Sequence, residues 1–245
     1  AGAGESTVPC APFSGCGACA YVIFSVAIRP IWQETMTDRS ANGVLLIFAK
    51  TPLPGYVKTR LIPELGARGA ADLYRKMLFR TVAVASRSKF SLLELWCTPE
   101  AAHPDIEYCK QEYSLEVRLQ IGKDLGERMY FALGHALERC EYAALIGCDC
   151  PGLDASDLDY AHARLKSGRH AVLGPAEDGG YYLLGLRQNN KRLFTDIEWG
   201  GAEVASTTRS RMTVLGWDWD ELPVKWDVDS PVDVKRLQTV MAGSF

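Results

Sequence analysis

The sequence lacks an excess of charge of either sign. Its 245 residues include 27 Lys and Arg and 30 Asp and Glu, so the formal net charge is −3 at pH 7. A protein dedicated to nucleic acid usually carries a clear basic excess, and we therefore expect no nucleic-acid partner. The hydrophobic share of 47% and charged share of 23% are typical of globular proteins and exclude a collagen-like or wholly disordered chain.

Long apolar runs are also missing. The run Ala18–Ile28 is far shorter than the roughly 20 residues that cross a bilayer. It also lacks the basic flank of a signal peptide, and its surroundings lack the arginines of a transit peptide. We expect a cytoplasmic protein in which residues 1–41 are an appendage outside the fold, disordered or loosely packed, and residues 42–245 form one domain. An alternative is that Met36 is the natural start.

Several sequence motifs that carry chemistry are absent. There is no Gly-Lys-Ser/Thr of a Walker loop, no Gly-x-Ser-x-Gly and no His-Glu-x-x-His. The pair Cys16 and Cys19 has the spacing of half a zinc site, but no second half follows. A chain of this length does not need the disulfides of a short secreted domain. The eight cysteines therefore favour a reduced set of thiols.

Strand and helix patterns alternate from Asn42 onward. Short apolar runs predict strands buried on both faces, and apolar residues three or four apart predict helices. The predicted strands are Val44–Ala49, Leu92–Cys97, Leu115–Ile121, Tyr142–Gly147, Ala171–Leu173 and Tyr181–Leu186. The predicted helices are Ala67–Arg87, Asp124–Arg139, Asp154–Lys166, a helix within Asp196–Thr213, and Pro231–Met241. This alternation predicts an α/β fold with a mainly parallel sheet.

Basic residues follow the first predicted strand. Lys50, Lys58 and Arg60 lie within eleven residues, in a segment that also holds two prolines and a glycine. Ligands of open α/β sheets bind beyond the carboxyl ends of the strands, and an Arg beside a Lys suits phosphate oxygens. The pattern favours a phosphate-binding loop, with a solvated basic loop as the alternative.

Acidic residues follow the later strands. Asp149 ends the fourth predicted strand, Asp178 precedes two glycines after the fifth, and Asp227 and Asp229 precede the last helix. Carboxylates at a sheet edge suit Mg²⁺ or Mn²⁺, so Asp149 with one of the last pair predicts a metal site. Asp178 is a candidate for orienting a sugar hydroxyl or a nucleophile. Asp229 has two other interpretations, a cap for the last helix or a solvated side chain.

Five segments resemble one known family, in the family's order and across nearly all of residues 43–240. They are Phe48–Leu61 (FAKTPLPGYVKTRL), Gln120–Met129 (QIGKDLGERM), Ile146–Leu153 (IGCDCPGL), Leu173–Leu186 (LGPAEDGGYYLLGL) and Asp227–Pro231 (DVDSP). This set is similar to the radical-SAM/selenodomain-associated transferases, the arsenosugar-biosynthesis-type glycosyltransferases. One departure is Trp199-Gly-Gly-Ala202, where relatives have Ser or Thr after the tryptophan.

The resemblance implies a fold, a cofactor and a set of site residues. The fold is the Rossmann-like GT-A (nucleotide-diphospho-sugar transferase) fold, three α/β/α layers around a mostly parallel mixed sheet, and the cofactor is Mg²⁺ or Mn²⁺. Catalytic roles fall to Lys58, Arg60 and Asp178. The residues implied for the nucleotide are Ala49, Lys50, Pro54, Gly55, Lys58, Thr59 and Arg60; for the sugar or acceptor, Asp178, Gly179 and Gly180; and for the metal, Asp149, Asp229 and Asp227.

Three functions stay open at this point. A glycosyltransferase would move a sugar from a nucleotide sugar to a small-molecule acceptor. A nucleotidyltransferase would join a nucleoside triphosphate to a phosphorylated molecule and release pyrophosphate, and the Lys-x-Arg loop suits a triphosphate equally well. A nucleotide-binding protein without turnover needs only the loop. The family name favours glycosyl transfer, by analogy.

Overall fold

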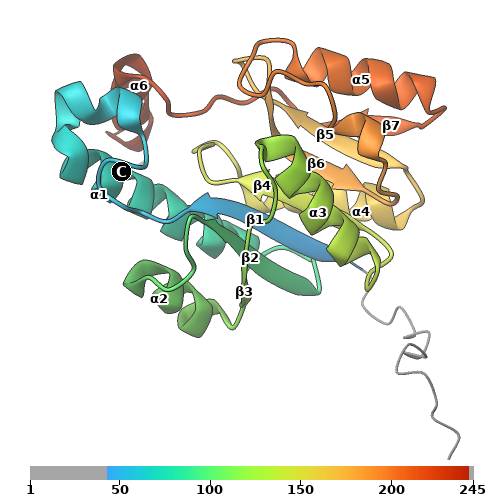
Figure 1. The fold of residues 1–245 in the computed structure, drawn as a ribbon, viewed down its shortest axis with the longest axis horizontal. Helices are drawn as coiled ribbons and strands as arrows, with labels where there is room; N and C mark the ends of the chain where they lie inside the picture. The colour runs from blue at the N-terminus through green and yellow to red at the C-terminus, as the bar shows by residue number, and fades with distance from the viewer. Residues whose placement is uncertain (1–42, 243–245) are drawn as a thin grey trace, which may run out of the picture. The chain divides into compact units, whose positions relative to one another are not determined.

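The computed structural model describes residues 43–242 (Figure 1). Three predictions lie outside the described residues: the appendage over residues 1–41, the Cys16–Cys19 half-site and the start at Met36. The strands are β1 (Val44–Lys50), β2 (Leu92–Thr98), β3 (Glu116–Leu119), β4 (Ala143–Gly147), β5 (Ala171–Pro175), β6 (Tyr181–Leu186) and β7 (Trp219–Glu221). The helices are α1 (Ile62–Ala85), α2 (Pro104–Tyr113), α3 (Leu125–Leu137), α4 (Ala155–Lys166), α5 (Val204–Val214) and α6 (Pro231–Ala242).

The strands form one mixed sheet in the order β3-β2-β1-β4-β6-β5-β7. The pairs β3–β2, β2–β1, β1–β4 and β5–β7 are parallel, whereas β6 is antiparallel to both of its neighbours. The strand order reverses between β1 and β4, and the loops that follow these two neighbours emerge side by side. Such a switch point is where open α/β sheets bind ligands.

Two hydrophobic cores cover the two faces of the sheet. On one face, α1, α2 and α4 pack against it through residues such as Tyr74, Ile106 and Leu158. On the other face, α3 and α5 contribute Leu133 and Met212. These layers confirm the predicted α/β fold with helices on both sides of a mostly parallel sheet (Figure 1).

A third core joins α6 to the start of α1. Leu61 and Val228 are fully buried there, together with Ala70, Met77 and Val234. Leu61 ends the segment that follows β1, and Val228 lies between two predicted metal ligands. This core therefore holds two parts of the predicted site together, although they are far apart in the sequence.

Some predicted boundaries were wrong, for identifiable reasons. The prediction began α1 at Ala67, but the helix begins at Ile62 and kinks at Gly66, where φ is 70°. The prediction of a helix within Asp196–Thr213 is confirmed by α5, which begins at Val204, after Gly200 with φ 86°. Helix α2 and strand β7 were missed. Only Ile106 and Cys109 of α2 are buried, so its apolar stripe is faint.

The five cysteines of the described residues are free and buried, as expected for packing thiols. Burial raises the pKa of the Cys97 and Cys109 thiols to about 12. Among the helices of residues 43–242, none combines the length and the apolar character that crossing a membrane requires.

Candidate active site

The loop after β1 is fixed at its start by three hydrogen bonds. The backbone N–H of Lys50 donates to the Tyr74 hydroxyl at 2.8 Å. The N–H of Thr51 donates to the carbonyl of Thr98 at 2.8 Å, and Gln120 Nε2 donates to the Ala49 carbonyl at 3.2 Å. Residues at the ends of β2 and β3 and a residue of α1 thus hold the backbone at the point where the chain leaves the sheet.

The second half of this loop directs one lysine inward. Gly55 adopts φ 86° with open space around it, a conformation that glycine adopts at little cost. The buried Val57 anchors the loop in the core. Lys58 follows in the left-handed region, with φ 46° and ψ 44°, which costs a non-glycine residue on the order of 1 kcal/mol. This strained backbone aims the Lys58 side chain into the protein, where it is only 5% exposed.

Lys58 meets two carboxylates from distant parts of the chain. Its Nζ lies 2.7 Å from Oδ1 of Asp149, two residues beyond β4, and 2.8 Å from Oδ1 of Asp229, two residues before α6. The bond to Asp229 has hydrogen-bond geometry. The contact with Asp149 is a close ion pair, and apart from Lys58 no described residue satisfies the buried Asp149 Oδ1. Three predicted site residues therefore converge at the carboxyl edge of the sheet.

The electrostatics of this cluster are dominated by negative charge. Burial lowers the pKa of Lys58, but the ion pairs with Asp149 and Asp229 outweigh burial and raise it overall. Burial raises the pKa of Asp227 to about 7, and the nearby carboxylates of Asp149, Asp178 and Asp229 add to that rise. The single Lys58 ammonium thus faces several carboxylates, which is an arrangement suited to a further cation.

The residues fit a hard divalent cation in their donor chemistry. Asp149, Asp227 and Asp229 offer carboxylate oxygens, the ligands that Mg²⁺ and Mn²⁺ prefer, and the buried Asp149 Oδ1 has no hydrogen-bond partner. Within the described part of the chain, no group of three acidic, histidine or cysteine side chains is arranged to hold a metal ion. Two of these carboxylates, from Asp149 and Asp229, instead contact Lys58.

The segment before α6 is fastened to the end of β4. The N–H of Val228 donates to the carbonyl of Asp149 at 3.0 Å, which fixes the spacing of the acidic residues. The carboxylate of Asp233 accepts the N–H groups of Asp229 and Ser230 and stabilises the start of α6. The interpretation of Asp229 as the helix cap is therefore wrong, since Asp233 does this and the Asp229 side chain binds Lys58.

Asp178 lies at the turn between β5 and β6. It is exposed, and its Oδ1 accepts the N–H of Gly180 at 2.9 Å. Gly179 has φ 89°, and a Cβ there would lie 2.0 Å from the carbonyl oxygen of Ala202. Close packing thus explains the glycine at 179 without any ligand. Asp178 is near enough to influence the pKa of Asp227 and borders the acidic cluster.

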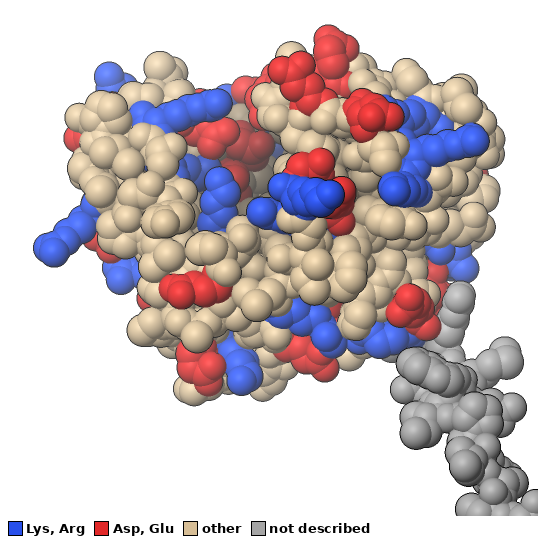
Figure 2. All heavy atoms as spheres, viewed as in Figure 1, with Lys and Arg blue, Asp and Glu red and all other residues tan. Residues whose placement is uncertain are grey.

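The remaining predicted residues are distributed along the loop. Ala49 is 2% exposed and its side chain packs into the core, so the structure leaves no methyl surface there for a ligand. The other residues implied for the nucleotide are exposed and reach solvent: Lys50, Pro54, Gly55, Thr59 and Arg60. In Figure 2, acidic and basic side chains gather around a hollow of this face.

Three supporting residues were missed by the sequence reasoning. Gln120 and Tyr74 hold the start of the loop, as described above. Lys225 Nζ donates to the Gly152 carbonyl at 2.7 Å and lies 2.7 Å from Oδ2 of Asp157. It thereby ties the loop after β4 to the segment before α6. Only Gln120 had a signal in the sequence, since it begins one of the five segments that resemble a known family.

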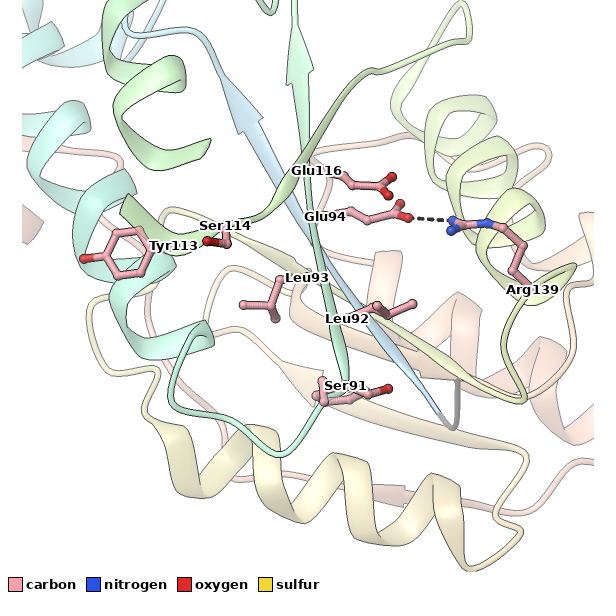
Figure 3. Close-up of a pocket in the computed structure, with 9 residues that line it drawn as sticks. Ser91, Leu92, Leu93, Glu94, Tyr113, Ser114, Glu116 and Arg139 are labelled. Atoms are coloured by element: carbon pink, nitrogen blue, oxygen red, sulfur yellow. Dashed lines mark hydrogen bonds and ion pairs between the residues drawn. The ribbon is translucent and has the colours of Figure 1, made fainter. Parts of the chain in front are cut away.

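Two cavities lie outside this cluster. One of about 280 Å³ lies beside the loop and includes Pro52, Pro54 and Arg75. The other, about 300 Å³, includes Ser91 and Glu116 (Figure 3) and lies at the amino ends of β2 and β3.

The cavity in Figure 3 is a weaker candidate for the site. Its buried Glu94 is already engaged: it accepts a hydrogen bond from Arg139 and another from Trp96 Nε1. We therefore place the candidate site at the carboxyl edge, where the predicted residues Lys58, Asp149 and Asp229 meet.

The comparisons with known proteins agree with this fold. Residues 81–201 match a family model described as "Uncharacterized protein conserved in bacteria (DUF2064)". No curated protein matches the chain in sequence. A crystal structure of a Desulfovibrio desulfuricans G20 protein, assigned as a nucleotide-diphospho-sugar transferase, is 32% identical over 78% of this chain and 83% of that one, with a TM-score of 0.71.

Two more distant structures share the fold alone. CMP:2-keto-3-deoxy-manno-octonic acid synthetase complexed with CTP is 10% identical over 84% of this chain and 100% of that one, with a TM-score of 0.52. Rv0371c of Mycobacterium tuberculosis H37Rv, solved with manganese, is 18% identical over 80% of this chain and 96% of that one, with a TM-score of 0.50.

The likeness to the Desulfovibrio desulfuricans protein defines a class, the nucleotide-diphospho-sugar transferase (GT-A) superfamily. Within it, the chain belongs to the family of the Desulfovibrio desulfuricans protein, given the identity and coverage of that match. The narrower resemblance to radical-SAM/selenodomain-associated transferases stays a prediction.

Proposed function

We propose that this protein is a glycosyltransferase that uses a divalent cation, takes a nucleotide sugar as donor and transfers its sugar to a small-molecule acceptor. The observation that carries the proposal is the convergence of Lys58, Asp149 and Asp229 at the switch point of the sheet. The family relationship to a protein assigned as a nucleotide-diphospho-sugar transferase supports the same conclusion.

The loop after β1 would bind the donor nucleotide. Its exposed Lys50 and Arg60 can pair with phosphate oxygens, and Lys58 lies deeper, toward the acidic cluster. A guanidinium and an ammonium together stabilise the negative charge that grows on a leaving diphosphate. Asp178, exposed at the border of the cluster, would orient the sugar or the acceptor hydroxyl.

Asp149, Asp229 and Asp227 would hold Mg²⁺ or Mn²⁺. A bound cation supplies charge neutralisation to the phosphates of the donor. The manganese complex of Rv0371c, a protein of the same fold, is consistent with such use. The carboxylates themselves must be ionised for metal binding, and the hydrogen bond from Val228 to the Asp149 carbonyl fixes two of the ligand-bearing segments relative to each other.

Nucleotidyl transfer is the second candidate. Lys50, Lys58 and Arg60 supply three cations within one loop, as many as a triphosphate would engage. The synthetase solved with CTP has the same fold. This alternative differs from the first in its products, pyrophosphate instead of a nucleoside diphosphate.

A thermal-shift panel distinguishes the two reactions. We would measure Tm with nucleoside triphosphates and with nucleotide sugars, each with and without Mn²⁺. We expect stabilisation by a nucleotide sugar that depends on Mn²⁺, and release of nucleoside diphosphate when acceptors are added. Stabilisation by a triphosphate alone, with pyrophosphate release, would replace glycosyl transfer with nucleotidyl transfer.

The Asp149→Asn variant separates an enzyme from a binding protein. It removes a carboxylate from the cluster and leaves the cationic loop in place, so we expect turnover to fall at least 100-fold while most of the nucleotide affinity remains. Glu112→Gln, the same carboxylate-to-amide change at an exposed position of α2, is the matched control. Absence of turnover in the wild-type protein with every donor would favour nucleotide binding without catalysis.

A further inference from the structure

Lys58 occupies the position that a cation shared by Asp149 and Asp229 would take. Its Nζ is in contact with one oxygen of each carboxylate, at 2.7 and 2.8 Å. Metal ions bind carboxylate oxygens at about 2.0–2.2 Å. An ion that contacted both oxygens from the side of Lys58 would therefore overlap the ammonium.

The ammonium and the metal also exclude each other electrostatically. Two positive centres that bind the same two oxygens repel each other strongly in a partly buried site. Lys58 is almost inaccessible to water, with 5% of its side chain exposed, whereas the two carboxylates are 44% and 47% exposed. A metal can thus approach the carboxylates from solvent, and it competes there with the buried ammonium of Lys58.

We propose that Lys58 is an internal counter-ion that a divalent cation displaces, so that metal binding releases the ammonium toward the phosphates of the donor. This inference rests on the metal use assigned under the proposed function. It adds a coupling between two binding events. Metal binding promotes donor binding, because Lys58 can contact a phosphate of the donor only after the metal has displaced it.

Three structural features favour such an exchange. Asp149 and Asp229 both contact Lys58, and a divalent cation neutralises two carboxylates where one ammonium neutralises one. The Asp149 carboxylate, which Lys58 contacts at 2.7 Å, is 44% exposed, so an ion from solvent can compete for it. Lys58 is also held in a left-handed backbone conformation, and moving its residue out of that conformation relieves strain.

Manganese binding without nucleotide tests the exchange. We would titrate Mn²⁺ into metal-free wild type, Lys58→Met and the control Lys76→Met, and count free Mn²⁺ by electron paramagnetic resonance. Lys76 is exposed on α1. We expect Lys58→Met, which keeps the aliphatic stem but lacks the competing ammonium, to bind Mn²⁺ at least tenfold more tightly than wild type, and Lys76→Met to match wild type. Equal or weaker binding by Lys58→Met would overturn the proposal.

Lysine acylation tests the same exchange in the unaltered protein. The wild type would be treated with N-hydroxysuccinimide acetate, with and without saturating Mn²⁺, and the modified lysines identified by peptide mass spectrometry. We expect Mn²⁺ to increase the rate at Lys58 at least fivefold and to leave the rate at Lys76 unchanged. A rate at Lys58 that Mn²⁺ leaves unchanged or lowers would contradict displacement.

The two proposals fail in different ways. If Mn²⁺ binds wild type and Lys58→Met equally and Lys58 stays unreactive, the exchange is wrong while metal use stands. If Mn²⁺ binds neither protein, metal use is wrong, and the exchange is wrong with it. If Mn²⁺ displaces Lys58 but no nucleotide sugar binds, the exchange holds and the glycosyltransferase proposal fails.

Discussion

At the scale of single residues, Gly179 and Gly200 share a backbone conformation but not an environment. Both have positive φ, 89° and 86°, but a Cβ at Gly179 would lie 2.0 Å from the Ala202 carbonyl oxygen, whereas a Cβ at Gly200 would meet nothing within 4 Å. Comparing the two positions separates the cost of the backbone conformation from the cost of the clash.

We expect Gly179→Ala to lower the free energy of unfolding by about 3 kcal/mol, since it combines strain with overpacking. Gly200→Ala should lower it by about 1 kcal/mol, the conformational cost alone. Urea unfolding followed by fluorescence measures both values. Equal losses of unfolding free energy at the two positions would show that the backbone at Ala202 shifts to accommodate the added Cβ at little cost.

Asp227 makes the stability of the metal-free protein depend on pH. Its pKa is about 7 in the folded protein, because of burial first and then of neighbouring carboxylates, against about 4 in an unfolded chain. Between these values the folded state holds the proton more tightly, so the Asp227 contribution to stability is present below pH 4 and is lost as the pH rises to 7.

Asp227→Asn should therefore be more stable than wild type at pH 8 and equal to it below pH 4. The measurement is the free energy of unfolding in urea across this range, with a chelator present. A difference between the two proteins that does not change with pH would contradict the burial of Asp227 among like charges.

The positions of the charged residues along the sequence predicted much of the site but not its pairing. Cations after the first strand and carboxylates after later strands were visible, since strand ends share one edge. The position of Lys58 between Asp149 and Asp229 could not be predicted, because the hydrogen-bonded residues Lys58 and Asp229 are 171 residues apart in the sequence. Such a contact depends on how α6 packs, and no local pattern reports that.

At the scale of elements, α6 holds one wall of the site in place. The two terminal guanidinium nitrogens of Arg236, in α6, donate hydrogen bonds to the two carboxylate oxygens of Glu177, at 2.7 and 3.0 Å. The central guanidinium carbon of Arg236 lies 4.3 Å from the ring centroid of Trp226. On its buried side, Val234 packs with Leu61. The helix thus joins the loop after β1, the turn after β5 and the acidic segment.

Leu61→Ala tests this packing. Removing a fully buried leucine leaves a cavity between α1 and α6, and we expect a loss of about 3 kcal/mol in unfolding free energy. Val232→Ala, on the exposed face of α6 with 73% exposure, should change it by less than about 0.5 kcal/mol. A small effect of Leu61→Ala in denaturant unfolding would mean that α6 contributes little to the fold.

The accuracy of the element predictions followed the strength of burial. The strands β1 and β4, which lie in the middle of the sheet, were predicted within a residue because nearly all of their residues are buried. Strand β7 has three residues, none of them fully buried, and gave no detectable pattern. Elements that bury few of their residues therefore cannot be predicted from the sequence pattern and are identified only in the tertiary structure.

At the scale of the whole molecule, the sheet runs without interruption from β3 to β7. Residues on both sides of the switch point share the same two cores: the first includes Cys97 from β2 and Val172 from β5. Such continuity supports the prediction that residues 42–245 fold as one domain, because neither side keeps a complete core without the other.

Buried thiols distributed through the sheet test that prediction. Cys97 and Cys109 report on the β2–α2 side and Cys140 on the end of α3, and their pKa values are raised first of all by burial. Because a thiol reacts only as an accessible thiolate, native protein should leave them unlabelled by iodoacetamide at pH 8. In rising urea, peptide mass spectrometry should show all three becoming labelled in one transition that coincides with the loss of fluorescence and helicity. If Cys109 became labelled at a clearly lower urea concentration than Cys140, the β2–α2 side would unfold separately, and the single-domain prediction would be wrong.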